Sequence, residues 1–177
     1  MGDCLWGTPG IRELKKAFPD TEIDLIVKKD WLDLFKYNPH LQNVYPYQNR
    51  WYAQILLGLK LLFKPKYSHI YIFHANNDFG RMKFFLKSSP LWNHQGHKWC
   101  PEQFNVKPEG NPSLDTNLHA IVRRLLMLKE MNVDLESPQM ELFFSDSEIN
   151  AFANYTDKNG LKTPFVVCHI GASSVDR

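Results

Sequence analysis

The stretch TPGIRELKKAFPDTEIDLIV, residues 8–27, decides the fold class, because a helix pattern passes directly into a strand pattern. Its apolar residues first recur at helical spacing after Thr8, which is the expected N-cap, and Pro19 ends the helix. Residues 22–27 are short, apolar and partly β-branched, which is typical of a strand. The stretch therefore predicts one helix–strand unit of an α/β protein.

The rest of the chain continues this alternation of helices and strands. Strands are predicted at 68–74 and 165–170, and a weaker one at 44–47, which Pro46 limits to a sheet edge or a strand end. Further helices are expected at about 30–37, 51–63, 79–86, 115–131 and 145–157. Strands that alternate with helices imply a parallel sheet covered on both faces. We expect a Rossmann-like α/β fold.

Two segments carry more specific local signals. Ser145 and Glu148 have the spacing of a capping box, which opens the last predicted helix. Residues 88–114 hold four prolines and show no hydrophobic period, so no regular element is expected there.

Composition limits the class of protein. The 177 residues are 44% hydrophobic, which is enough for a buried core. No apolar run approaches the roughly 18 residues of a membrane span. The three cysteines, Cys4, Cys100 and Cys168, are odd in number and far apart, which argues against a disulfide framework. We expect a cytoplasmic protein.

Charge is unevenly distributed along the chain. Residues 1–100 carry a balance of +6 and residues 101–177 a balance of −4. The basic part suits an anionic partner, and no nucleic-acid partner is expected. The helix at 51–63 is flanked or interrupted by Arg50, Lys60, Lys64 and Lys66. It fits either a core-facing helix with a solvated basic side or a peripheral contact with an anionic membrane.

Metal and dinucleotide sites are not expected. His94, His97 and Cys100 offer three ligands, but no fourth is evident. No Gly-x-Gly-x-x-Gly follows a strand, which disfavours a nicotinamide enzyme, and no Walker A motif is present.

The N-terminal residues resemble the signature of glycosyltransferase family 9, the lipopolysaccharide heptosyltransferases. The motif runs Gly2-Asp3-x4-Thr8-Pro9-x-Ile11-Arg12-x-Leu14-Lys15-x2-Phe18-Pro19-x3-Ile23-Asp24. The pattern continues in order with Asn38-Pro39, Tyr67 through His74, Asn117-Leu118-His119 and His169-x-Gly171-Ala172-Ser173. The resemblance implies a GT-B fold. Residues 1–163 would then form an acceptor-side domain without its first strand, and residues 164–177 the start of a donor-binding domain.

The resemblance also implies a chemistry, namely inverting, metal-independent transfer of heptose from an ADP-heptose donor to the lipopolysaccharide core. It places the catalytic base on Asp3, and it implies no cofactor. Asp3 is expected in a loop before the helix that begins near Thr8. The positive end of that helix favours an ionised carboxylate, although an aspartate in a structural loop fits the residues as well.

Substrate contacts follow from the same resemblance and from strand ends. The predicted donor loop is Gly171, Ala172, Ser173 and Ser174, where small residues let backbone N–H groups approach a diphosphate. Acceptor contacts are expected from Gly2, Thr8, His74, Asn76 and Arg81. His74 ends a predicted strand and Asn76 and Arg81 follow it, and open α/β sheets bind ligands outside such carboxyl ends. Ordinary polar turns remain the alternative for both sets.

Two functional classes remain open. The first is a heptosyltransferase-like enzyme of which this chain is a fragment, with little activity alone because the donor domain is needed for productive geometry. The second is a non-catalytic remnant or binding module that keeps the acceptor surface.

Overall fold

The computed structural model describes residues 2–65, 67–72, 91–93, 119, 121–122, 128–129, 132–133, 136–162 and 164. The chain divides into two compact units, Met1–Phe143 and Phe144–Arg177. The domain boundary expected after residue 163 lies inside the second unit and stays a prediction.

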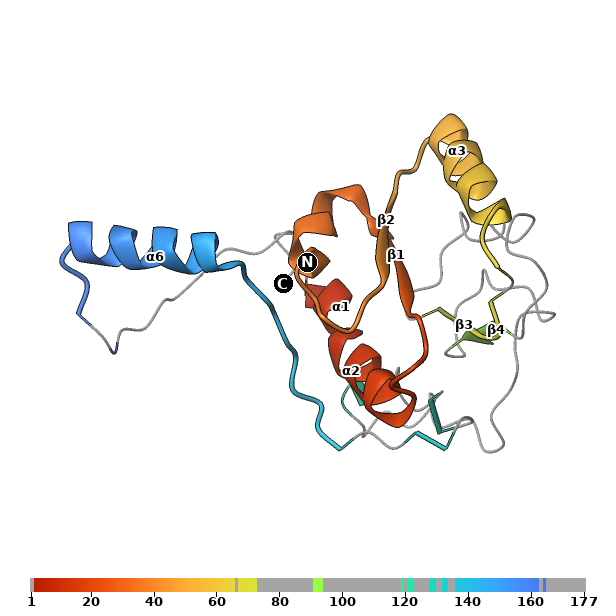
Figure 1. Cartoon of the computed structure of the whole chain (residues 1–177), viewed down its shortest axis with the longest axis horizontal. Helices are drawn as coiled ribbons and strands as arrows, with labels where there is room; N and C mark the ends of the chain where they lie inside the picture. The colour runs from red at the N-terminus through yellow and green to blue at the C-terminus, as the bar shows by residue number, and fades with distance from the viewer. Residues whose placement is uncertain are drawn as a thin grey trace. The chain divides into compact units, whose positions relative to one another are not determined.

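The first unit opens with two helices and a strand, as Figure 1 shows. These are α1 (Gly2–Leu5), α2 (Thr8–Ala17) and β1 (Asp24–Lys28). The predicted helix and strand of residues 8–27 are therefore confirmed. The predicted N-cap is wrong, because Gly7 holds that position without a side-chain cap and Thr8 is already helical.

A parallel strand pair forms the centre of this part of the fold. After β1, the 3-10 helix η1 (Lys29–Phe35) leads to β2 (Asn43–Tyr47), which pairs with β1 in parallel from Asp24–Asn43 to Lys28–Tyr47. An α-helix was expected where η1 lies. The weak strand prediction at 44–47 is confirmed, and in the described sheet β2 has β1 as its one neighbour, which suits Pro46.

Both faces of this strand pair are covered. Val27 of β1 packs with Ile11 of α2 and Phe35 of η1 on one face. Its neighbour Ile26 points to the other face and contacts a buried cluster of β2 and the following helix that includes Leu57. Because successive strand residues face opposite ways, burial on both sides confirms the α/β layering.

Four further elements complete the described structure. They are α3 (Trp51–Leu62), β3 (Ile70–Ile72), β4 (Leu91–Asn93) and α6 (Asp146–Lys158). Strands β3 and β4 form a second parallel pair with Ile70 opposite Leu91. The expectation of no regular element in 88–114 is wrong, since β4 lies there. A three-residue strand is too short to show a hydrophobic period.

Side chains connect the start of β1 to its neighbours. The Asp24 carboxylate accepts hydrogen bonds from Asn43 Nδ2 at 2.7 Å and from the Tyr67 hydroxyl at 2.8 Å. Burial and this hydrogen bond to Asp24 raise the pKa of Tyr67. The segment that precedes β3 is thereby attached to the first strand pair.

Other predicted elements are described only in part. Of the helix expected at 115–131, Ile121 and Val122 are α-helical and Leu128 and Lys129 are in a 3-10 turn, and Ile121 and Leu128 belong to one buried cluster. The helix expected at 79–86 and the strand at 165–170 lie outside the described residues. None of the helices in the described ranges is long and apolar enough to cross a bilayer.

The second unit contains α6, whose start confirms the predicted capping box. The Ser145 hydroxyl accepts from the Glu148 backbone N–H at 3.2 Å, and the Glu148 carboxylate accepts from the Ser145 N–H at 2.8 Å. The helix ends at Lys158, one residue beyond its expected end, and Gly160 follows with φ +62°. Glycine adopts this left-handed conformation at little steric cost, because it has no Cβ.

Replacing Ser145 by alanine should destabilise α6 by about 1 kcal/mol, because the backbone N–H of Glu148 loses the hydroxyl that accepts from it. Hydrogen exchange of the α6 amides should accelerate most in the first turn. The matched control is Thr156→Ala, which removes a hydroxyl from the same helix without touching the cap. Equal exchange in both variants would contradict a stabilising cap.

Candidate functional site

The predicted base, Asp3, lies in α1 and not in a loop. The Gly7 N–H donates to the Cys4 carbonyl at 3.3 Å, and the Thr8 hydroxyl donates to the Leu5 carbonyl at 2.8 Å. These bonds complete one helical turn just before α2. Helix α2 begins at Thr8, five residues after Asp3. The catalytic role of Asp3 stays a prediction.

The residues that follow Asp3 are anchored in two separate apolar clusters. Cys4 packs against the cluster of Ile11, Val27 and Phe35. Trp6 packs against a different cluster, which includes Leu14 of α2. Cys4 and Trp6 are partly buried against these two clusters, so the segment that carries Gly2 and Asp3 is attached to the fold at two points.

A histidine from far along the chain lies beside this segment. The rings of Trp6 and His119 meet edge to face, with centroids 6.2 Å apart and an interplanar angle of 65°. His119 Nδ1 accepts the backbone N–H of Ile121 at 3.3 Å, so the ring proton of the neutral form resides on Nε2. Its side chain is exposed. Sequence reasoning did not select His119 as a site residue, although it belongs to the Asn117-Leu118-His119 motif.

Thr8, a predicted acceptor contact, is buried at 1% exposure. Besides donating to Leu5, its hydroxyl accepts the backbone N–H of Glu141 at 3.0 Å. Thr8 thus connects α1, α2 and a segment more than 130 residues away. Contact with an acceptor stays a prediction, and the observed bonds give Thr8 a role in positioning the start of α2.

Replacing Thr8 by valine should lower the free energy of unfolding by about 1–2 kcal/mol, because the shape is kept while the Leu5 carbonyl and the Glu141 N–H lose their partner. Urea unfolding followed by tryptophan fluorescence measures the change. The matched control is Thr21→Val at an exposed position. A variant as stable as this control would show that the two bonds contribute nothing.

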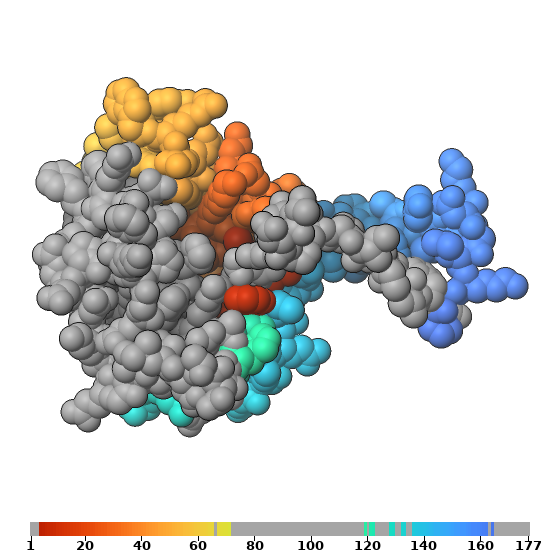
Figure 2. Space-filling model, turned by 180° about the vertical axis from the view of Figure 1, so that it is seen from behind, coloured from red at the N-terminus to blue at the C-terminus, as the bar shows by residue number. Residues whose placement is uncertain are grey.

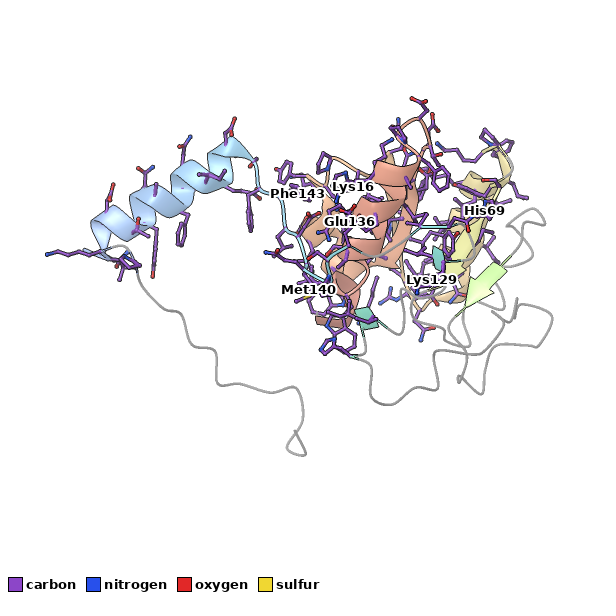
Figure 3. All side chains as sticks on the ribbon, turned by 90° about the horizontal axis from the view of Figure 1, so that it is seen from below. Lys16, His69, Lys129, Glu136, Met140 and Phe143 are labelled. Atoms are coloured by element: carbon purple, nitrogen blue, oxygen red, sulfur yellow. The ribbon has the colours of Figure 1, made fainter. Side chains whose placement is uncertain are left out.

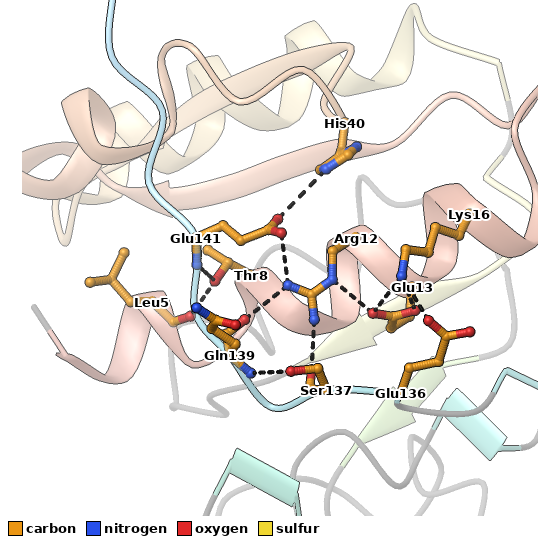
Figure 4. Close-up of polar contacts among 10 residues, drawn as sticks. All are labelled: Leu5, Thr8, Arg12, Glu13, Lys16, His40, Glu136, Ser137, Gln139 and Glu141. Carbon is orange, nitrogen blue, oxygen red and sulfur yellow. Dashed lines mark hydrogen bonds and ion pairs between the residues drawn. The ribbon is translucent and has the colours of Figure 1, made fainter. Parts of the chain in front are cut away.

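An ionic network joins α2 to residues 136–141 (Figure 4). Arg12 is its centre, since its guanidinium donates to Glu13 at 2.7 Å and to Glu141 at 2.8 Å. It also donates to the backbone carbonyls of Ser137 and Gln139, at 2.7 Å and 2.9 Å. Arg12 and Glu13 are both buried and form an internal ion pair. The guanidinium of Arg12 has four acceptors in all, two carboxylates and two backbone carbonyls.

The outer part of the network is more exposed. Lys16 lies beside Glu136 (Figure 3), with 2.9 Å between Nζ and Oε2, and it also reaches Glu13. On the other side, His40 Nε2 lies 3.7 Å from Glu141 Oε2, which is an ion pair only when His40 is protonated. The His40 ring also meets Phe143 edge to face at 5.8 Å.

Charges in the network stabilise one another. Burial disfavours the charge on Arg12, but hydrogen bonds to Glu141 and Glu13 outweigh that cost and raise the pKa of Arg12. Hydrogen bonds to Glu136 and Glu13 raise the pKa of Lys16, and Lys16 lowers the pKa of Glu136. Sequence reasoning missed this network because its partners are far apart along the chain.

The other predicted site residues lie outside the described residues. They are His74, Asn76, Arg81 and the donor loop Gly171, Ala172, Ser173 and Ser174. His94, His97 and Cys100, the weak metal candidates, lie outside them too. Within the described ranges, no group of three or more His, Cys, Asp or Glu residues is arranged to hold a metal ion.

The fold matches a solved structure of known class. The chain superposes on the crystal structure of a glycosyl transferase of family 9 from Veillonella parvula DSM 2008 with a TM-score of 0.80 and 16% sequence identity. The match covers 99% of this chain and 52% of that chain, so the present chain spans about half its length. No protein-family model matches the chain, and no curated protein matches it. The chain therefore shares its fold with part of a family 9 glycosyltransferase.

Proposed function

We propose that this chain is the acceptor-side part of an inverting glycosyltransferase. The transferred sugar would be a heptose from ADP-heptose, and the acceptor a hydroxyl of the lipopolysaccharide core at the cytoplasmic face of the inner membrane. The single observation that carries the proposal is the shared fold with a family 9 glycosyltransferase over nearly the whole chain. The Gly2-Asp3 to Asp24 motif supports it independently.

In the proposed reaction Asp3 takes the proton of the acceptor hydroxyl. The acceptor oxygen attacks the anomeric carbon of the heptose from the side opposite the leaving group. The bond between that carbon and the β-phosphate oxygen breaks, and its electron pair leaves with ADP. One displacement inverts the anomeric configuration, as the family resemblance implies, and it needs no metal ion.

Substrate contacts are proposed on two sides of this reaction. Backbone N–H groups of residues 171–174 would bind the diphosphate of the donor. His74, Asn76 and Arg81 would bind the acceptor. His119 joins them as a candidate, because its exposed ring contacts Trp6, three residues from Asp3. Because His119 Nδ1 accepts the backbone N–H of Ile121, Nε2 is the ring atom that can donate to a sugar or phosphate oxygen.

A binding experiment tests the acceptor side on the chain as it is. The probe is soluble inner-core oligosaccharide, titrated into labelled protein and followed by NMR. We expect it to shift the indole signal of Trp6 and the ring signals of His119, whereas exposed Trp51 serves as an internal control. Shifts at Trp51 alone, or none, would contradict the proposed acceptor site.

A second experiment tests the reaction. ADP release from ADP-heptose is measured with the acceptor present, for the chain alone and joined to a donor-binding half. We expect turnover only in the joined protein, since both substrates must be held in one geometry. Acceptor binding without ADP release in either form would instead favour the non-catalytic binding module.

A further inference from the structure

Helix α3 presents an apolar surface to solvent. Six large apolar side chains recur at i, i+1, i+4, i+5, i+8 and i+12, which is one helical stripe. We call them the α3 stripe; they are Trp51, Tyr52, Ile55, Leu56, Leu59 and Phe63. Phe63 is 91% exposed, Trp51 68% and Leu56 65%. Figure 2 shows α3, in yellow-orange, at the outside of the first unit.

The stripe is not needed for the core of the first unit. The opposite side of α3 supplies the buried residues, with Leu57 and Leu61 packed against Tyr45 of β2. The core-facing side expected of this helix is present, and its outer side exposes large apolar residues together with Lys60. A helix that is apolar on both sides belongs inside a larger core or at a membrane, and exposed apolar patches of this kind mark interaction surfaces.

The surroundings of the stripe are basic. No Asp or Glu occurs between Asp33 and Asp78, whereas Arg50 precedes α3 and Lys60 and Lys64 lie at its end. Lys60 is exposed within the stripe, with Nζ 5.1 Å from the Tyr45 ring centroid. Large aromatic and aliphatic residues combined with nearby cations are typical of helices that lie in the plane of an anionic bilayer surface.

We propose that the α3 stripe docks on an anionic lipid bilayer, with α3 parallel to the membrane plane. Twelve helical residues span about 18 Å, so the stripe lies along the interface and does not cross it. Trp51 and Tyr52 place rings with polar atoms at the headgroup level. Arg50, Lys60 and Lys64 attract anionic headgroups. This inference does not rest on the proposed glycosyl transfer.

A second copy of this chain fits the stripe less well than a lipid surface. Two stripes placed face to face would bring Arg50 and Lys60 of both copies together, with no acidic residue of α3 to neutralise them. Helix α6 gives an internal comparison. It also exposes Ile149, Phe152 and Tyr155, but Asp146 and Glu148 make its first turn acidic, so an anionic surface would repel it.

The test is co-sedimentation of the full chain with vesicles of 30% phosphatidylglycerol in phosphatidylcholine. We expect binding that falls strongly in 0.5 M NaCl and on pure phosphatidylcholine, because the basic residues supply part of the attraction. Leu56→Glu and Phe63→Glu should each weaken the partition coefficient at least about tenfold. Lys60→Gln keeps the apolar stripe and should weaken it about fivefold.

The matched control is Ile149→Glu, which puts the same charge at a comparably exposed position of α6 and should leave binding unchanged. Leu56 and Phe63 are exposed, so thermal unfolding should show that all variants are folded. No binding to anionic vesicles would overturn the proposal, as would equal binding of Leu56→Glu and wild type. A lipid-free dimer that Leu56→Glu dissociates would assign the stripe to a second copy instead.

Discussion

Asp3→Asn should lower the turnover of heptose transfer by about 100- to 10,000-fold in a protein that carries both substrate halves. The substitution keeps the size of the side chain and removes its ability to accept a proton. Binding of the donor should change less than about twofold, because the proposed base would act on the acceptor hydroxyl only in the transition state. The measurements are ADP release under saturating substrates and calorimetric titration with ADP.

Two comparisons separate loss of a base from structural damage. Asp20→Asn changes an exposed aspartate just after α2 and should leave turnover unchanged. The wild-type rate should also fall in acid as the base becomes protonated, and Asp3→Asn should lose that limb of the pH profile. A variant that retains most of its turnover would remove Asp3 from the mechanism and leave the acceptor surface without its proposed base.

The sequence predicts well those helices, strands and caps that depend on residues close together along the chain. The helix that begins at Thr8, the strand that contains Val27 and the capping box at Ser145 each depend on residues within a few positions of one another, and all three are confirmed. Strand β4 was missed because three residues among prolines carry too little signal. Its pairing with β3, about twenty residues earlier, defines it instead.

Side-chain roles were harder to predict than elements. The sequence predicts Thr8 as an N-cap, because Thr before a helix usually accepts from the first turn. Its hydroxyl instead accepts from Glu141, a partner 133 positions away. The contact of His119 with Trp6 could not be predicted either, since only the fold brings residues 6 and 119 together. The outer face of α3 is a third case, because spacing alone does not show which apolar stripe is buried.

The Arg12 network has an energetic consequence that depends on burial. The Glu13 side chain is 3% exposed, and Arg12 donates to it at 2.7 Å. Removing the cation would leave this carboxylate buried with only half-exposed Lys16 at 3.3 Å as compensation. The carbonyls of Ser137 and Gln139 would lose their donor as well. Loss of one partner from a buried pair is far more costly than loss of a surface pair.

Arg12→Leu should therefore lower the free energy of unfolding by about 3–5 kcal/mol, whereas Lys16→Leu should lower it far less, because the Lys16 ion pairs are exposed to solvent. Urea unfolding followed by tryptophan fluorescence measures both, and all five tryptophans lie in the first unit. The double variant Arg12→Leu/Glu13→Leu should recover part of the loss, because no unpaired carboxylate remains. Equal midpoints for Arg12→Leu and Lys16→Leu would mean that the bonds of Arg12 to Ser137, Gln139 and Glu141 do not hold residues 136–141 against α2.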